Sequence, residues 1–434
     1  MQTDNRKATI GWALYDWANS AFATTVMAGF FPIFFKQFWS VGSDTSVSTA
    51  RLGLANSIAG VTVALLAPVL GAIADKGTSR KKFLMFFAYM GVVMTLSLYL
   101  VSGGNWPAAI VLYIFAVIGF SGGNIFYDSL ITAVASEKRL HSVSALGFSL
   151  GYLGGGILFA MNVWMTLRPE TFGFADVQEA VRVSFISVGV WWAVFSIPLL
   201  VFVKEPVSSK AAGISAIRAG LAQLKETFHE IRHLKTIFLF LFAYWLYIDG
   251  VDTIVVMAVD YGMSIGLQSN DLIVALLITQ FVGFPCAIGF GYLGGKIGAK
   301  KSIFIAIAVY LFVSIWGAFM QSRNEFYILA ITVGFVQGGI QALSRSFFAR
   351  IIPVEKSAEY FGFYNMIGKF AAVIGPVLMG GTGLIVRSMG HSNEIASRVG
   401  ITSVSLLFIA GGILLSLVNE EKGKEEAKYL SQKK

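Results

Sequence analysis

Residues 71–82 read GAIADKGTSRKK, and residues 291–301, 220 positions later, read GYLGGKIGAKK. Each stretch follows a long apolar segment, begins with a glycine and finishes in a cluster of basic residues. A second match links Gly147-Phe148 with Gly362-Phe363 at the similar offset of 215 residues. Because the matches occur in the same order, the second half of the chain is a diverged copy of the first half in parallel orientation.

Apolar segments run through both halves and decide the fold class. Of the 434 residues, 56% are hydrophobic and 13% are charged, whereas soluble proteins carry about 25% charged residues. Segments of about 20 apolar residues recur between short polar breaks, so we expect an all-α polytopic membrane protein with two pseudo-symmetric six-helix bundles. The twelve predicted spans are 9–39, 52–74, 83–102, 107–134, 142–163, 183–203, 235–261, 270–291, 302–321, 325–348, 358–386 and 399–418.

The longest polar break divides the spans six and six. It predicts an N-terminal bundle at 1–204, a cytoplasmic linker at 205–234, a C-terminal bundle at 235–420 and a charged cytoplasmic tail at 421–434. Apolar residues recur in the linker at helical spacing, which favours an amphipathic helix at the membrane surface over a plain linker. These residues are Ile217, Leu221, Leu224, Phe228 and Ile231.

The net charge of +9 reports topology rather than nucleic-acid binding. The basic residues cluster in alternate loops, from Arg6 and Lys7 to the five lysines between Lys422 and Lys434. By the positive-inside rule these loops and both termini are cytoplasmic and face anionic lipid headgroups, and no motif that reads RNA or DNA accompanies them. Short loops favour a bacterial inner membrane over a vacuolar membrane.

Six ionisable residues fall inside the predicted spans. A charged side chain at the centre of a bilayer costs at least about 2.5 kcal/mol, so such residues mark solute and proton pathways. They are Asp16, Asp128, Asp249, Asp252, Arg345 and Lys369. Polar side chains three or four residues away share a helix face with them. These partners are Asn19, Asn124, Trp245, Gln337, Gln341 and Asn365. The twelve residues together are the candidate site for solute and protons.

Four acids against two bases predict that at least one carboxylate is protonated in some state, because a dry interior tolerates surplus charge poorly. Asp249 and Asp252 lie one helical turn apart and are expected to form a coupled proton site. We hypothesise that a zwitterionic solute places its amine there and its carboxylate near Arg345 or Lys369. The hypothesis fails if Asp249→Asn and Asp252→Asn both leave pH-driven transport intact.

Each of these residues also has a purely structural interpretation. Asp128 with Arg345 fits a gating or structural ion pair as well as it fits solute contact. Asp16 is so near the inner interface that a role as a helix-end charge or gate is favoured over solute binding. Lys369 fits equally well as the neutralising partner of an acid, and Trp245 belongs to a residue type that more often packs than binds solutes.

No sequence pattern supports an enzyme, a cofactor or a metal site. The nearest approach to a P-loop, Gly294 to Lys301, has Ala299 in place of the second glycine. One His-Glu-x-x-His match, HEIRH at 229–233, falls in the predicted linker. Three Gly-x-Ser-x-Gly matches, at 119–123, 147–151 and 262–266, lie in or next to predicted helical spans, whereas a nucleophile elbow needs a strand-to-helix turn. No Cys pair occurs, and the single cysteine, Cys286, excludes an internal disulfide. We therefore expect no catalytic residues, no cofactor and no metal.

Four stretches carry a resemblance to a known family: YDWANSAF at 15–22, GFSLGYLGG at 147–155, QALSRS at 341–346 and GKFAA at 368–372. With the repeated loop at 71–82, they resemble the major facilitator superfamily, in the branch of the fungal autophagy-related vacuolar effluxer and its bacterial relatives. The resemblance covers essentially the whole chain. It implies two rocking six-helix bundles, a cavity lined by spans 1, 4, 7 and 10, and release of amino acids by the fungal relative.

The resemblance also implies a conformational latch. In the family, the acid of the repeated loop pairs with basic residues and with a neighbouring helix end, roles that fit Asp75 and Arg80. The second copy of the loop has Gly295 where the acid would stand. The latch is therefore expected on one side only.

The sequence as a whole predicts a secondary transporter that moves a small polar or zwitterionic, amino-acid-like solute by alternating access, coupled to protons. We expect membrane lipid around it, no nucleic-acid partner and a monomer. Two alternatives stay open: a proton-antiport exporter of amphipathic drugs, and a non-transporting sensor or receptor on the same fold. A non-transporting relic should tolerate neutralisation of Asp249, Asp252 and Arg345, whereas a transporter should lose function.

Overall fold

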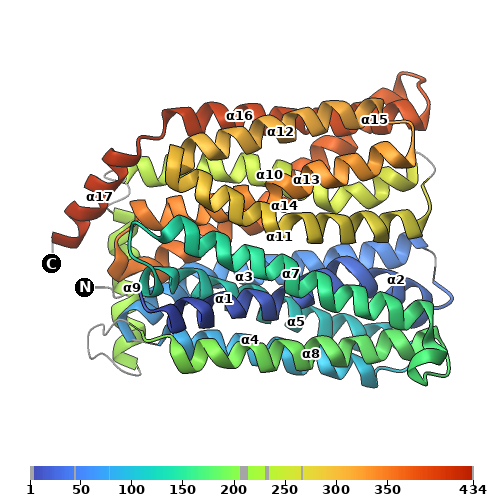
Figure 1. Ribbon diagram of the computed structural model, residues 1–434, viewed down its shortest axis with the longest axis horizontal. Helices are drawn as coiled ribbons and strands as arrows, with labels where there is room; N and C mark the ends of the chain where they lie inside the picture. The colour runs from blue at the N-terminus through green and yellow to red at the C-terminus, as the bar shows by residue number, and fades with distance from the viewer. Residues whose placement is uncertain are drawn as a thin grey trace. The chain divides into compact units, whose positions relative to one another are not determined.

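The computed structural model describes residues 4–43, 45–77, 79–205, 214–229, 234–264 and 267–432. All regular elements among these residues are helices, labelled in Figure 1. The first half of the chain forms α1 (Arg6–Ala21), α2 (Phe31–Phe34), α3 (Thr45–Gly77), α4 (Arg80–Ser97), α5 (Trp106–Ser129), α6 (Ile131–Val134), α7 (Leu140–Leu167) and α8 (Val177–Phe202). The second half forms α10 (Lys235–Ser264), α11 (Ser269–Ile297), α12 (Ala299–Phe319), α13 (Arg323–Ile351), α14 (Ser357–Ser388), α15 (Asn393–Ser403) and α16 (Ser405–Leu417). Helices α9 (Ile214–His229) and α17 (Glu420–Gln432) follow the first and second halves.

Twelve helical segments among the described residues are long and apolar enough to cross a membrane. Each overlaps one of the twelve predicted spans, so the predicted fold class is confirmed. The ends differ by a few residues: the helix predicted at 142–163 runs from Leu140 to Leu167. Such differences arise because a helix continues into the polar interface for as long as its backbone hydrogen bonds continue.

The first span has an unusual backbone. It covers Arg6–Trp39 and contains two π-helical segments, η1 (Phe22–Phe30) and η2 (Phe35–Trp39). Aromatic packing accompanies them, since the rings of Phe31 and Tyr113 stack with centroids 4.0 Å apart. Most π-helices are single turns, often at functional sites. The spacing of apolar residues does not reveal the π-helical segments, because their composition is as apolar as that of the α-helix around them.

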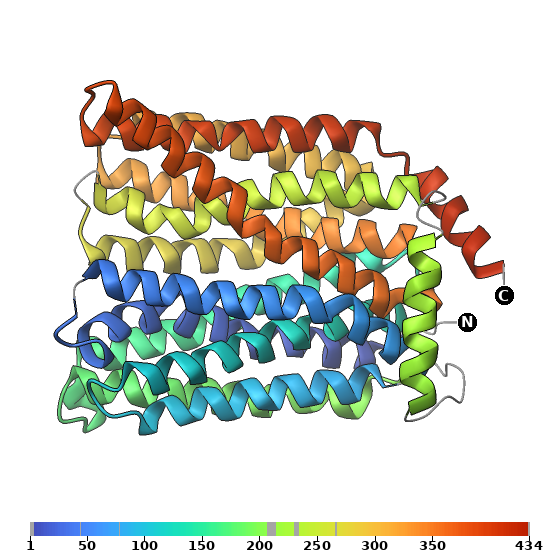
Figure 2. The same ribbon diagram turned by 180° about the vertical axis from the view of Figure 1, so that it is seen from behind.

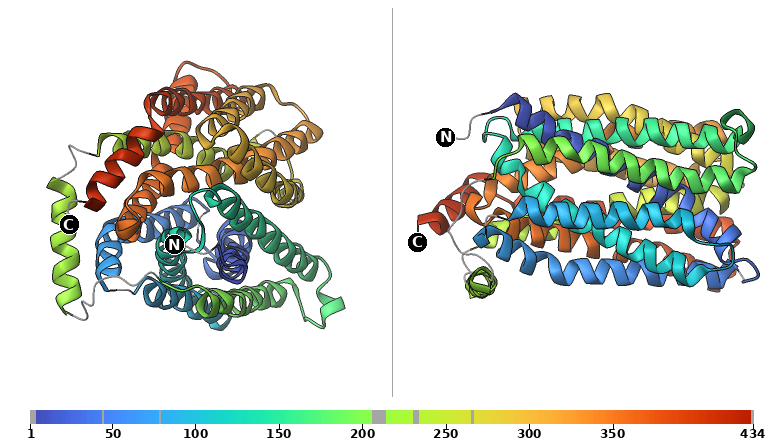
Figure 3. Two further views of the ribbon diagram at one scale, coloured as in Figure 1. Left: turned by 60° about the vertical axis from the view of Figure 1, so that its left-hand side comes forward. Right: turned by 90° about the horizontal axis from the view of Figure 1, so that it is seen from below.

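The chain divides into two compact units. Unit 1 contains Met1–Ser136, Leu150–Leu224 and Ala358–Asn365, and unit 2 contains Glu137–Ser149, Lys225–Ser357 and Met366–Lys434. In each unit the long helices run side by side (Figure 3). The first turns of α7 thus belong to unit 2 and the first turns of α14 to unit 1, which are matching segments of the duplicated sequence. The domain limits at 204, 234 and 420 stay a prediction.

Glycines bring helix backbones close together within each unit. In unit 1, a Cβ added to Gly119 of α5 would lie 2.6 Å from the backbone oxygen of Phe87 on α4. In unit 2, a Cβ added to Gly411 of α16 would lie 2.8 Å from the backbone nitrogen of Tyr247 on α10. Small residues at such crossings are how membrane helices gain packing contacts, since lipid offers no hydrophobic driving force between them.

Helix α9 confirms the helix predicted in the linker, although Ile231 lies outside the described residues. It lies across the ends of the long helices of unit 1 (Figure 2). A Cβ on Gly220 would lie 2.7 Å from the Cα of Ile73 on α3. The side chain of Leu221, by contrast, is 47% exposed. Helix α9 therefore turns a small residue toward unit 1 and an apolar residue outward, an arrangement suited to a helix at a membrane surface.

Candidate functional site

Asp16 on α1 lies among aromatic side chains in unit 1. Its carboxylate accepts a hydrogen bond from the Tyr127 hydroxyl of α5 at 3.0 Å. The Tyr127 ring stacks on the Trp12 ring with centroids 4.4 Å apart, and Trp12 Nε1 donates to the backbone oxygen of Tyr127 at 2.9 Å. Asp16 is only 8% exposed. This packing fits the structural interpretation of Asp16, because the aromatic partners fix its carboxylate between α1 and α5.

The predicted polar partners on α1 and α5 also meet within unit 1. Asn19 Nδ2 donates to Asn124 Oδ1 at 2.6 Å. Asp128, further along α5, accepts from Asn365 Nδ2 at 3.1 Å. Asn365 belongs to the first turns of α14, so Asp128 contacts a helix from the second half of the sequence. Asn365 was predicted to share a face with Lys369, and this contact with Asp128 was not predicted.

Asp249 on α10 is an acceptor for the backbone of α14 in unit 2. Its carboxylate receives the N–H of Ile374 at 3.1 Å, the N–H of Gly375 at 2.9 Å and the Thr253 hydroxyl at 3.3 Å. Pro376 follows inside the helix and has no N–H to donate. The side chain of Asp249 is completely buried. Three donors compensate this burial, so Asp249 anchors α14 to α10.

Asp252 is in a different setting, although it lies one turn from Asp249. It interacts electrostatically with Lys369 of α14 and with Asp249. The acid and base come from α10 and α14, the same two helices that Asp249 joins. The structure therefore brings together three of the predicted charged residues and distinguishes their surroundings.

Two further predicted residues of unit 2 have polar atoms that are buried without a hydrogen-bond partner among the described residues. These atoms are Trp245 Nε1 on α10, a donor, and Gln337 Oε1 on α13, an acceptor. Gln341, one turn from Gln337, is partly exposed. Buried polar groups without partners cost free energy, so each of these two atoms is a position at which a ligand could supply the missing hydrogen bond.

Arg345 on α13 holds the first turns of α7 within unit 2. Its Nε donates to Ser144 Oγ and its Nη2 to the Ser144 backbone oxygen, both at 2.9 Å. The guanidinium also lies over the Phe148 ring, 4.2 Å from the centroid. Ser144 Oγ in turn donates to the backbone oxygen of Ala342 at 2.7 Å. These contacts give Arg345 a structural role, and its contact with a solute stays a prediction.

Asp75 and Arg80 form a buried ion pair in unit 1. Arg80 Nε and Nη2 lie 2.9 and 2.6 Å from Asp75 Oδ1. The Asp75 carboxylate also accepts the N–H groups of Ala358 at 3.1 Å and Glu359 at 2.9 Å, in the first turn of α14. This geometry corresponds to the arrangement that the family resemblance implied. At Gly295, the matching position, an added Cβ would meet nothing within 4 Å.

Sequence reasoning missed a charged cluster in unit 2, formed by Glu137, Arg350, Glu420 and Lys424. Arg350 Nη1 lies 3.0 Å from Glu420 Oε1, and Lys424 Nζ lies 3.3 Å from Glu137 Oε1. The sequence shows Arg350 and Lys424 as basic residues of predicted loops, but membrane topology alone already explains basic residues there.

No group of three His, Cys, Asp or Glu side chains in the described part of the chain could hold a metal ion.

Comparisons with known proteins agree with this architecture. The sequence profile of the family described as "Vacuole effluxer Atg22 like" matches residues 47–428. The MFS-type transporter YxiO of Bacillus subtilis (strain 168) is 38% identical over 413 residues, which cover 94% of each chain. Autophagy-related protein 22 of Yarrowia lipolytica is 27% identical over 321 residues, 66% of this chain and 52% of that protein.

Solved structures show the same fold. The structure of the MFS proton:xylose symporter XylE matches with a TM-score of 0.71 at 13% identity, covering 98% of this chain and 97% of that chain. At this identity the likeness establishes the fold alone, which is the major facilitator fold. The relatives are transporters rather than enzymes. The chain is therefore an integral membrane protein of the major facilitator superfamily and belongs to the Atg22-like vacuole effluxer family.

Proposed function

We propose that this protein is a proton-coupled secondary transporter that moves a small zwitterionic, amino-acid-like solute across a bacterial plasma membrane by alternating access. The observation that supports this most is the Asp252–Lys369 pair in unit 2, which places an acid and a base on the two neighbouring helices α10 and α14. A zwitterion carries one charge of each sign and can replace each partner of such a pair.

Asp252 is the proposed proton carrier. Asp249 already accepts three hydrogen bonds, two of them from the α14 backbone, and donors of this kind stabilise the ionised carboxylate. Asp252 depends instead on the charge of Lys369. Protonation of Asp252 would release Lys369 for the carboxylate of the solute, and deprotonation would restore the pair. We therefore propose Asp252 alone as the proton carrier, in place of the coupled Asp249–Asp252 site predicted from the sequence.

The unpartnered atoms of Trp245 and Gln337 supply the proposed polar contacts. Trp245 Nε1 can donate to a solute carboxylate, and Gln337 Oε1 can accept from a solute amine. Asp16, Asn19, Asn124 and Asp128 are proposed to shape the pathway within unit 1. Asp75 with Arg80 is proposed to act as the latch, because its contact with the first turn of α14 can exist in only one arrangement of these helices.

Substrate identification comes first in the experimental test. Purified protein is screened by thermal shift against amino acids, short peptides, organic cations and sugars at two pH values, because a ligand that binds only the native state raises apparent stability. Zwitterions that stabilise in a pH-dependent manner support the proposal. Stabilisation by hydrophobic cations alone would support drug export instead, and no stabilisation across the panel would favour the non-transporting alternative.

Flux in proteoliposomes then tests the assignment of the proton site. Asp252→Asn should abolish proton-driven uptake while retaining solute exchange between the two sides, since exchange needs no net proton movement. Asp249→Asn should weaken both activities together, because it removes an anchor of α14. Asp252→Asn with normal pH-driven flux would refute the assignment. Glu170→Gln, at a side chain that is 70% exposed, is a matched acid-to-amide control.

A further inference from the structure

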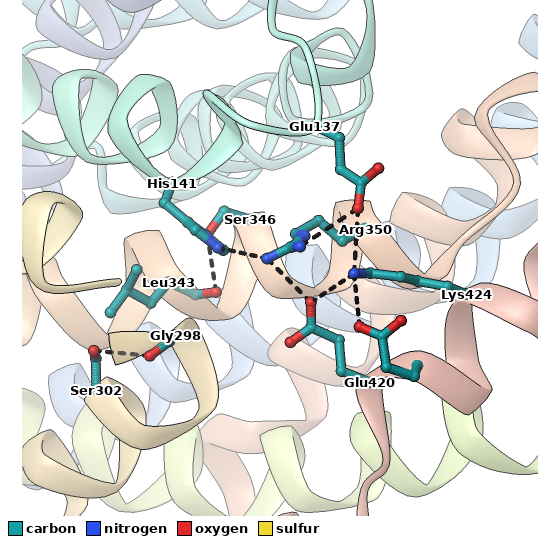
Figure 4. Close-up of polar contacts among 10 residues, drawn as sticks. Glu137, His141, Gly298, Ser302, Leu343, Ser346, Arg350, Glu420 and Lys424 are labelled. Atoms are coloured by element: carbon teal, nitrogen blue, oxygen red, sulfur yellow. Dashed lines mark hydrogen bonds and ion pairs between the residues drawn. The ribbon is translucent and has the colours of Figure 1, made fainter. Parts of the chain in front are cut away.

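Charged side chains from three segments of unit 2 meet at one place (Figure 4). Glu137 precedes α7, Arg350 lies at the end of α13, and Glu420 and Lys424 lie in the first turns of α17. Arg350 Nη2 is 3.4 Å and Nη1 is 3.0 Å from carboxylate oxygens of Glu137 and Glu420, respectively. Lys424 Nζ is 3.3 Å from each of the same two oxygens. This cluster, the Arg350 cluster, connects α17 and the start of α7 to α13.

His141 extends the Arg350 cluster into the protein interior. It lies in the first turn of α7 and is only 4% exposed. Its Nε2 is 2.9 Å from Arg350 Nη1, and its Nδ1 is 2.8 Å from Ser346 Oγ on α13. Ser346 Oγ in turn donates to the backbone oxygen of Leu343 at 3.1 Å. Figure 4 shows these side chains in one continuous chain of hydrogen bonds.

The two ends of this chain fix the protonation state of His141. A guanidinium can only donate, so Arg350 donates to His141 Nε2, and Nε2 must carry a lone pair. A carbonyl oxygen can only accept, so the Ser346 hydroxyl hydrogen points to Leu343, and Ser346 Oγ must accept from His141 Nδ1–H. His141 is therefore a neutral imidazole protonated on Nδ1. A second proton on Nε2 and the hydrogen bond from Arg350 are mutually exclusive.

We propose that His141 is a proton-binding site that regulates the transporter: proton uptake at Nε2 expels Arg350 and loosens the hold of α13 on α17 and on the first turns of α7. Histidine is the side chain whose charge ordinarily changes near neutral pH. The charged groups around it are Arg350 from α13, Glu137 from the segment before α7, and Glu420, Glu421 and Lys424 from α17. This regulation rests on the proposed transport function, but its test uses no transport.

Helix α17 is well placed to respond, because the Arg350 cluster holds its start while separate contacts hold its later turns. Thr236 at the start of α10 donates its N–H and hydroxyl to the Glu426 carboxylate at 3.1 and 2.8 Å. A Cβ on Gly423 would lie 3.0 Å from Ile351 Cγ2, so the helix packs closely on the end of α13. Ser431 donates to the Glu355 carboxylate at 3.2 Å. The Arg350 cluster adds the contacts to the start of the helix.

Glu137 and Lys424 of the Arg350 cluster do not titrate between pH 5.5 and 7.5. Partial burial would raise the pKa of Glu137, but the hydrogen bond and charge of Lys424, with the charge of Arg350, lower that pKa below its ordinary value of 4.5. Partial burial would lower the pKa of Lys424, but hydrogen bonds to Glu421 and Glu137 raise that pKa above its ordinary value of 10.5. A response in this interval therefore points away from these two groups.

The test is hydrogen–deuterium exchange of the purified full-length protein at pH 5.5 and 7.5, corrected for the intrinsic pH dependence of amide exchange. The readout is the protection of peptides from 137–149 and from 420–432. In the wild-type protein, both segments should lose roughly tenfold in protection at pH 5.5, the effect of one lost charge-assisted hydrogen bond. His141→Gln should abolish this response, because the Gln oxygen accepts from Arg350 and takes up no proton in this interval.

Two further variants make the result decisive. Arg350→Gln keeps His141 but removes the group that a proton expels, so it should also abolish the response even if His141→Gln does not fold. His391→Gln changes an exposed histidine outside the cluster and should respond as the wild type does. The proposal is overturned if His141→Gln or Arg350→Gln retains the wild-type response, or if the wild type shows none. A protein without transport activity would give the same exchange result, so a failure of this proposal can be distinguished from a failure of the proposed transport function.

Discussion

The carboxylate of Asp75 accepts the backbone N–H of Glu359 at 2.9 Å, across 284 positions of sequence. The first N–H groups of a helix have no partner within the helix, and a negative charge at this end also interacts favourably with the helix dipole. Asp75 therefore serves the N-terminus of α14 and neutralises Arg80 at the same time. Both roles depend on the close approach of α3 to α14, which the absence of a side chain at Gly71 permits.

Asp75→Ala should destabilise the protein by about 3–5 kcal/mol, because it leaves the buried Arg80 guanidinium without its counter-charge. Arg80 is 5% exposed, so water cannot replace the carboxylate. The measurement is the denaturation midpoint in mixed micelles. Gly295→Ala, at the matching position with open space around it, should shift the free energy of unfolding by about 0.5 kcal/mol or less. Equal midpoints for the two variants would contradict the structural role given to Asp75.

Gly375→Ala should destabilise the protein and impair transport, because the added Cβ would lie 2.7 Å from Asp249 Oδ1 and even closer to the Thr253 hydroxyl. The hydrogen bonds from the N–H groups of Ile374 and Gly375 to Asp249, which join α14 to α10, would have to lengthen or break. Gly380→Ala, five residues further along α14 where nothing lies within 4 Å, should instead gain up to about 1 kcal/mol from helix propensity. Opposite signs for these two substitutions, measured as unfolding midpoints, are the expected result. A stabilising Gly375→Ala would show that α14 is not held in this way.

The contrast between Asp249 and Asp252 shows how far sequence reasoning reaches. Hydropathy and segment length predicted the spans that form α10 and α14 and the position of both acids within the first of them, because these properties are local. The contact of Asp249 with the N–H groups of Ile374 and Gly375 depends on which face of a distant helix packs against α10, and neither residue carries a polar side chain that could signal it. The Arg350 cluster was hidden for another reason, since topology already accounts for charges in loops. The pairing of Asp75 with Arg80 and with a helix end could be foreseen only through the family resemblance.

Trp245→Phe should weaken solute binding without lowering stability. Trp245 Nε1 is buried with no hydrogen-bond partner among the described residues, so removal of this donor relieves an unmet desolvation cost of about 1–3 kcal/mol in the empty protein. A solute acceptor that uses the donor would lose that hydrogen bond. The thermal stabilisation by an identified zwitterion should therefore fall, with Kd raised about tenfold. Trp164→Phe, at a side chain that is 56% exposed, is the control and should bind as the wild type does.

Below the pH interval in which His141 is proposed to act, the docking of α17 should weaken further as Glu137 is protonated. The hydrogen bond and charge of Lys424, with Arg350, outweigh partial burial and lower the pKa of Glu137 below 4.5. A lowered native pKa stabilises the fold above the ordinary value, and this contribution disappears as the pH falls through the native value. The pKa of Lys424 is raised above 10.5, so its own contribution is lost only in strong base. The side chain of Glu137 is 60% exposed, which keeps the effect below about 1 kcal/mol.

Glu137→Gln isolates this contribution. The protection of residues 420–432 in wild-type protein should exceed that in Glu137→Gln at both pH 7.5 and pH 5.5, because Glu137 stays ionised and paired with Lys424 throughout. The difference should shrink below pH 4.5 and vanish once Glu137 is protonated in the wild type. Glu170→Gln, where the ion pair with Arg168 is long and both side chains are 70% exposed, should show no effect on these residues at any pH. A wild-type advantage that grew on acidification would mean that the carboxylate of Glu137 is not what holds α17, since protonation can only weaken its contacts with Lys424 and Arg350.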